Sequence, residues 1–196
     1  MLNTTRITAI SILLLLAGCV RSLQPLYTEK DLIFDEKLVG CWSDENPDAK
    51  WCFSKQSEKA YRLVVTENGS SGSFDVHLFK IEGKLFMDLL PRQQELNEND
   101  FYKFHLLPVH TFLHVKQIEP TLQMRFPDRN WFDNHIIKAP DALQHQMVQR
   151  DIIVTATTEE MQTFWLKHLD SKGAFQKFTN LTRAVEVPEQ KTNEDK

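Results

Sequence analysis

The sequence has no cluster of lysine or arginine residues. Its acidic and basic residues are interspersed and give a net charge of −4 at pH 7. Proteins that bind nucleic acid through a basic face concentrate positive charge to neutralise phosphates. We therefore expect no nucleic-acid partner.

Motifs of the common enzyme classes are also missing. The chain contains no His-Glu-x-x-His, no Walker loop and no dinucleotide fingerprint, and Ser70-Ser71 lack the Gly-x-Ser-x-Gly spacing of a nucleophile elbow. Cys41 and Cys52 lack the closely spaced Cys or His partners of a zinc site. We expect no catalytic residue, no metal and no cofactor.

Two pairs of residues that contain histidine are candidates for chemistry. His110 and His114 fall in a predicted strand, where residues four apart are roughly 13 Å apart and cannot share an ion. His77 and Asp88 are predicted to face each other across a hairpin, on its outer side. Without a nucleophile or pocket, we interpret them as a surface pair worth about 0–1 kcal/mol.

The main apolar run lies at the N-terminus and is short. Arg6 precedes Ile7 to Leu16, and small residues then lead to a cysteine in Leu16-Ala17-Gly18-Cys19. This run has about half of the roughly 20 residues that span a bilayer, so we predict a cleavable signal rather than a membrane helix.

The end of this signal resembles the lipobox of bacterial lipoproteins. The resemblance implies cleavage before Cys19, attachment of its thiol to diacylglycerol, and acylation of the new amine with a chain such as palmitate. Several acyl chains anchor a protein stably, because each buried CH₂ contributes about 0.8 kcal/mol. Val20 follows the cysteine in place of Asp, which in a Gram-negative host implies the periplasmic face of the outer membrane. An ordinary secretory signal with an incidental Cys19 is the alternative.

Removal of the signal leaves enough chain for one domain. We assign 1–18 to the signal peptide, 19–36 to a lipidated tether and 37–186 to a single β-rich domain. Residues 187–196 are polar, and we expect a disordered tail.

The two remaining cysteines are predicted to form a disulfide. An exported chain meets an oxidising compartment, where such a bond persists. An antiparallel hairpin centred on Asn46-Pro47 places Cys41 opposite Cys52 and, on its other face, Trp42 opposite Trp51. Two separate buried thiols are the alternative.

The remaining pattern predicts about eight or nine short strands and two short helices. The clearest hairpin joins Phe74–Ile81 to Lys84–Leu90, with Val76 and Leu78 on the same face as Met87 and Leu89.

Helices are predicted at about 128–138, with Asp128 as cap, and at 158–170, where Thr157 and Glu160 have capping-box spacing. Other strands are expected at 60–66, 104–118, 121–126, 146–149, 152–156 and 181–185.

A second resemblance concerns the fold. Gly40-x-Trp42 on the first strand, with Arg183 after the late helix, resembles the lipocalin pattern, in which a C-terminal Arg packs across the Trp. The chain also resembles small uncharacterised bacterial lipoproteins. We predict a mainly β fold, either an antiparallel lipocalin-like barrel or a strongly bent sheet.

Trp42, Trp51 and Phe53 are candidates to line an apolar pocket, although such residues also form ordinary cores. We therefore predict a non-enzymatic, lipid-anchored envelope protein that binds a small apolar or amphiphilic ligand. The alternative is a ligand-free lipoprotein that docks on another envelope component.

Overall fold

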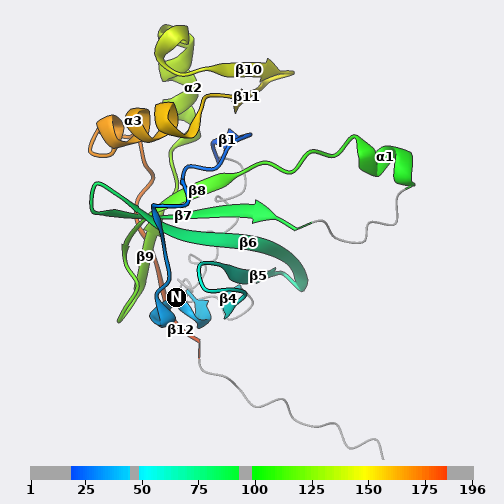
Figure 1. Ribbon diagram of the computed structural model, residues 1–196, viewed down its shortest axis with the longest axis vertical. Coiled ribbons are helices and arrows are strands. Elements are labelled where there is room, and N and C mark those ends of the chain that lie inside the picture. Colours follow the sequence, from blue (N-terminus) through cyan, green and yellow to red (C-terminus); the bar gives the residue numbers. More distant parts are fainter. Residues whose placement is uncertain (1–18, 45–48, 93–98, 185–196) are drawn as a thin grey trace, which may run out of the picture.

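The computed structural model describes residues 19–44, 49–92 and 99–184. The predicted signal, the Asn46-Pro47 turn and the predicted tail from 187 onward lie outside these ranges. Eight antiparallel strands form a closed barrel (Figure 1). They are β3 (Gly40–Ser43), β4 (Lys50–Lys55), β5 (Tyr61–Glu67), β6 (Ser70–Ile81), β7 (Lys84–Pro91), β8 (Thr111–Gln117), β9 (Leu122–Arg125) and β12 (Thr179–Arg183).

The barrel closes where the last strand pairs with the first. Arg183 of β12 lies opposite Trp42 of β3, and the other barrel strands pair with their neighbours in chain order. An additional strand, β2 (Leu32–Ile33), pairs with β6. The predicted mainly β antiparallel fold is confirmed, and the sheet is a closed barrel rather than an open bent sheet.

The β6–β7 hairpin has the predicted register. Ile81 pairs with Lys84 across a two-residue turn, and Leu78 pairs with Met87. Both turn residues, Glu82 and Gly83, have positive φ, as the turn type that matches strand twist requires. Because side chains alternate along the strands, the residues predicted to share a face, Val76, Leu78, Met87 and Leu89, point into the barrel.

A long insertion between β9 and β12 forms a second layer beside the barrel (Figure 1). It contains α2 (Arg129–Lys138), η2 (Pro140–Ala142), β10 (His145–Val148), β11 (Asp151–Val154) and α3 (Thr158–His168). Both predicted helices are confirmed, including the Asp128 cap and the reciprocal Thr157–Glu160 capping box. The strands predicted near 146–149 and 152–156 exist, but they form a separate sheet with β1 (Arg21–Ser22).

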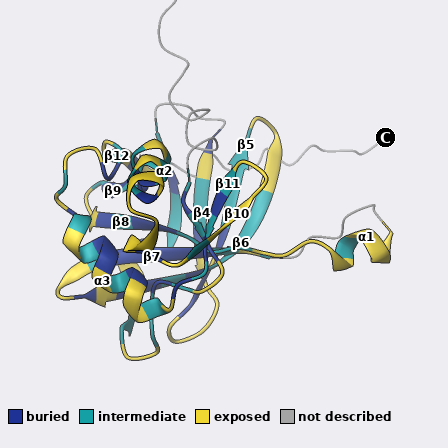
Figure 2. Cartoon of the chain, turned by 90° about the horizontal axis from the view of Figure 1, so that it is seen from above, coloured by how far each residue is buried: buried dark blue, intermediate teal, exposed yellow. Residues whose placement is uncertain are grey.

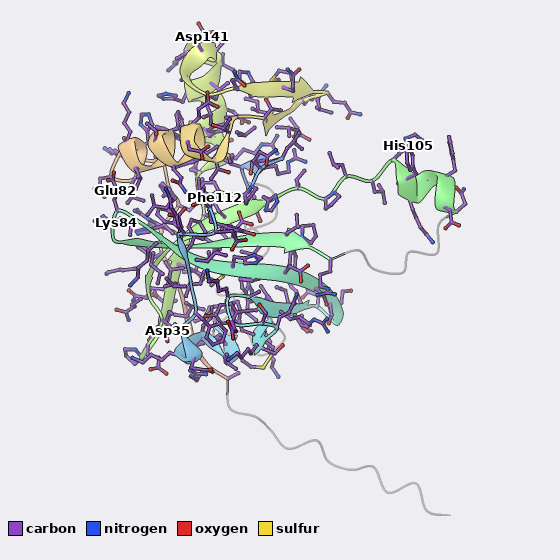
Figure 3. The ribbon with its side chains drawn as sticks, viewed as in Figure 1. Asp35, Glu82, Lys84, His105, Phe112 and Asp141 are labelled. Carbon is purple, nitrogen blue, oxygen red and sulfur yellow. A yellow bond between two sulfur atoms is a disulfide. The ribbon has the colours of Figure 1, made fainter. Side chains whose placement is uncertain are left out.

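Two apolar cores lie on the two faces of the β6–β7–β8 wall. Inward side chains, among them Leu78, Met87 and Leu113, fill much of the barrel and form the inner core. The outward rings of Phe79, Phe86 and Phe112 belong to the outer core, which includes residues of α2 and α3. Phe112, labelled in Figure 3, meets Trp165 of α3 edge to face, with ring centroids 5.2 Å apart. Figure 2 shows the buried residues along these strands.

The segment 19–36 is not a spacer, in contrast to our prediction. Val20 and Leu26 are buried in the outer core, and β1 pairs in parallel with β11. Mixed charge and Pro25 favour a solvated tether, but the apolar side chains of Val20 and Leu26 pack against the outward rings of the barrel wall.

The strand predicted from Phe104 begins later, at Thr111. Residues Asp100–Phe104 form a short helix, α1, because the side chain of Asn99 accepts a hydrogen bond from the amide of Tyr102. Pro108 has no N–H for strand pairing, and it lies in the stretch between α1 and β8. Within the described ranges, no helix is long and apolar enough to cross a membrane.

Candidate functional site at the open end of the barrel

One end of the barrel is filled, and we call it the closed end. The short helix η1 (Glu36–Leu38) brings Leu38 beneath Trp42, whose indole Nε1 donates a hydrogen bond to the Leu38 carbonyl at 2.9 Å. The guanidinium carbon of Arg183 lies 4.3 Å from the centroid of a Trp42 ring, within cation–π range. This is the packing that the lipocalin resemblance implies.

Gly40 makes that arrangement fit. Its φ is +123°, which L side chains rarely adopt, and a Cβ placed there would overlap Nη1 of Arg183. The same guanidinium donates to the carbonyls of Val39 and Lys37, each at 2.6 Å. Arg183 therefore ties the last strand to the segment that closes this end.

The other end, which we call the open end, holds a cavity of about 370 Å³. This volume is at the lower end of the roughly 300–1,000 Å³ typical of small-ligand pockets. Its apolar lining comes from Ala49, Trp51, Val65, Phe74, Leu89 and Phe126. The cavity can hold one apolar group, such as part of an acyl chain, while a larger polar head would remain outside it.

The lining follows from strand alternation and one small residue. Trp51 pairs with Val65, which in turn pairs with Gly72 of β6, so these positions share a face. Gly72 contributes no side chain there, and a Cβ would lie 3.6 Å from the Phe74 ring, an ordinary contact. Gly72 is not itself a lining residue, but a larger side chain at this inward position would be directed toward the lining residue Phe74.

Charged groups gather on one side of the cavity. Asp151 accepts from Arg21 at 2.7 Å and from Arg129, and Arg129 also contacts Asp133 at 3.3 Å. Hydrogen bonds from Arg21 and Arg129 lower the pKa of Asp151. The rim thus combines fixed donors and a carboxylate beside an apolar interior, which suits an amphiphile. Sequence reasoning missed these three residues, which come from β1, α2 and β11.

Cys19 also lines the cavity, next to this charged group. Burial raises the pKa of its thiol to about 11, against the opposing effect of Arg21. As a thiol it is therefore protonated at neutral pH and is not a thiolate nucleophile.

The three predicted pocket residues separate in the structure. Trp51 lines the open-end cavity. Trp42 and Phe53 are buried in the inner core and are not among its lining residues. Cys41 and Cys52 are bonded across β3 and β4, with Trp42 opposite Trp51 in the same register, as predicted.

A buried polar cluster lies outside the barrel wall, under the N-terminal segment. Asp88 is 1% exposed and accepts from His110 Nδ1 at 2.6 Å and from the Leu26 amide at 3.3 Å. His77 lies opposite Asp88, as predicted, and its Nδ1 is 3.0 Å from the Tyr27 hydroxyl. The prediction of a surface pair was wrong, because segment 20–28 and the second layer cover this face.

These groups are linked to one another and to the N-terminal segment by hydrogen bonds. His114 lies on β8 and His110 just before it. No group of three or more metal-binding side chains occurs in the described part of the chain. Since none of the cluster lines the open-end cavity, the cavity is the best candidate site.

No family model, curated protein or solved structure matches this chain. The candidate site is therefore interpreted from its own geometry.

Proposed function

We propose that this chain is a lipid-anchored envelope protein whose barrel binds a small amphiphile at its open end. The observation that carries the proposal is the 370 Å³ apolar cavity, bordered by Arg21, Arg129 and Asp151. An acyl chain or similar apolar group would occupy the interior. Its polar head would meet the charged rim, where the arginines donate to an anionic or carbonyl oxygen.

The lipid anchor is supported by the sequence Leu16-Ala17-Gly18-Cys19. Attachment at Cys19 would place the acyl chains at the rim of the cavity, since Cys19 lines it. The chain would then lie in the cell envelope, on the periplasmic face of the outer membrane in a Gram-negative host.

A ligand-free docking protein would be favoured by a barrel filled throughout. The closed end is filled by Leu38, Trp42 and their neighbours. The open end keeps its cavity, and this difference favours ligand binding over a purely structural role.

Tryptophan emission tests ligand binding in the full-length protein. Titration with a long-chain fatty acid or a lysophospholipid should change the emission saturably, because Trp51 lines the cavity. Trp51→Phe should remove most of the change, whereas Trp42→Phe should preserve it. An unchanged emission with both amphiphiles would contradict the proposal.

The anchor has a separate test. The intact mass of protein purified from membranes should equal the chain from residue 19 plus its acyl groups. Cys19→Ala should leave the signal uncleaved and the chain unacylated. An unacylated wild-type protein would refute the anchor without affecting the ligand titration.

A further inference from the structure

An apolar arm projects from the open end, at residues 99–107 between β7 and β8. Phe101, Phe104 and Leu107 are 77%, 83% and 69% exposed. Tyr102 and Leu106 are also exposed, so the arm holds five of the nine exposed large hydrophobic side chains in the described ranges. Figures 1 and 2 show α1 standing away from the body, and Figure 3 shows His105 on it. Such concentration marks an interaction surface.

The root of the arm is joined to the segment that follows Cys19. Ser22 and His110 exchange two backbone hydrogen bonds, of 3.0 and 2.9 Å. Asp88 holds the His110 ring from the barrel wall at 2.6 Å. Leu89 and Thr111, at the ends of β7 and β8, line the cavity together with Cys19. The arm and the anchoring residue therefore belong to the same rim.

We propose that this arm inserts into the lipid bilayer beside the anchor and holds the open end against the membrane. The inference rests on the proposed lipidation of Cys19, which would bring a lipid surface to this rim. Aromatic and aliphatic side chains enter the headgroup and acyl boundary to a depth of about 5–10 Å. Tyrosine suits this boundary because its ring is apolar and its hydroxyl remains hydrated.

The charges of the arm agree with a lipid partner. Lys103 lies 3.4 Å from Asp100, so the arm presents a neutral pair and the apolar side chains supply the attraction. Because the anchor already holds the protein at the surface, insertion is effectively intramolecular and needs little affinity of its own. An amphiphile would then enter the cavity directly from the bilayer.

A fluorescent probe on the arm tests insertion. Acylated Phe104→Cys protein, processed from the full-length chain, carries an environment-sensitive dye and is reconstituted in vesicles of phosphatidylethanolamine and phosphatidylglycerol. Lys84→Cys, exposed at the β6–β7 turn of the closed end, is the matched control. We expect nitroxide lipids to quench the arm probe and leave the control probe bright, with stronger quenching by shallow than by deep nitroxides. High salt should not reverse the quenching, because the attraction is not ionic.

The outcomes separate the anchor from the arm. Acylated protein whose arm probe stays unquenched would overturn the insertion and leave the anchor standing, with a protein as the partner of the arm. Equal quenching at both sites would also overturn it, because the orientation would then be unspecific. Protein that lacks acyl mass and stays in the aqueous phase would contradict both proposals.

Discussion

Trp42 and Trp51 lie opposite each other across the β3–β4 hairpin, yet their rings have different surroundings. Trp42 is fully buried, hydrogen-bonded to Leu38 and covered by Arg183. Trp51 is half-buried and lines the cavity. The same residue type in paired positions therefore closes one end and leaves space at the other.

The difference arises from the neighbours of each ring. At the closed end, η1 and Arg183 occupy the space around Trp42. At the open end, Gly72 leaves a side-chain position empty next to Val65. The number of aromatic residues does not distinguish a core from a pocket. The difference depends on the size of the neighbouring side chains and on the segments that pack over the ring.

Truncation of the two tryptophans should give the largest contrast. Trp42→Ala should destabilise the protein by about 3–5 kcal/mol, since it empties a fully packed site. Trp51→Ala should cost about 1–2 kcal/mol, because its ring already borders a cavity. Urea unfolding of both variants measures the difference. Equal losses would show that the two ends are packed alike.

The Cys41–Cys52 bond joins the strands that carry these tryptophans. Its removal in Cys41→Ala/Cys52→Ala should cost about 2–3 kcal/mol, because the oxidised unfolded chain is constrained by a short loop. Non-reducing peptide mapping of the exported wild type should first show the bond. If the double variant loses the Trp51 ligand response while remaining folded, the disulfide would shape the pocket as well as the fold.

Acid should lower the stability of the protein through His114, which lies on the outer face of the barrel wall and at neither end. Burial, with Arg125 and Lys84 nearby, lowers the pKa of His114 to about 4. In the unfolded chain His114 binds a proton near pH 6.5, whereas in the folded protein it does so only near pH 4. The free energy of unfolding therefore decreases as pH falls from about 6.5 toward 4. We expect a loss on the order of 1–2 kcal/mol after allowance for solvent screening. Burial also lowers the pKa of His77 and of His168, so His114→Gln should reduce the slope of this part of the stability curve without removing it. An unchanged slope would contradict the assignment.

Filling the cavity should have the smallest effect on stability. Gly72→Leu places a side chain toward Val65 and should change the unfolding free energy by only about 0.5 kcal/mol, while it removes ligand binding. Ser73→Leu adds the same side chain on the opposite face of β6 and should leave binding intact. Loss of binding in both variants would argue against the open-end site.

Local signals in the sequence predicted local structure well. Alternation gave the registers of the first hairpin and of the β6–β7 hairpin, and capping residues marked α2 and α3. The start of β8 was misplaced, because the apolar residues from Phe104 to Leu107 have the composition of a strand, although Phe104 ends α1 and the others follow it in the arm.

Contacts between distant segments were not predictable in the same way. Arg21, Arg129 and Asp151 carry no shared motif, so nothing in their spacing indicates that they meet at the cavity. A signal for the second layer did exist, because Phe79, Phe86 and Phe112 fall on the outward face of the predicted strands. Outward aromatic rings of this kind indicate a covered wall, and they explain why the His77 and Asp88 side is not at the surface.

Native mass spectrometry with lipid analysis, on protein purified from the membranes of its own host, tests the central claim most directly. We predict one co-purifying amphiphile per chain in the wild type and in Ser73→Leu, and none in Gly72→Leu. A wild-type protein that carries no bound amphiphile and acquires none when fatty acid or lysophospholipid is added would contradict ligand binding at the open end.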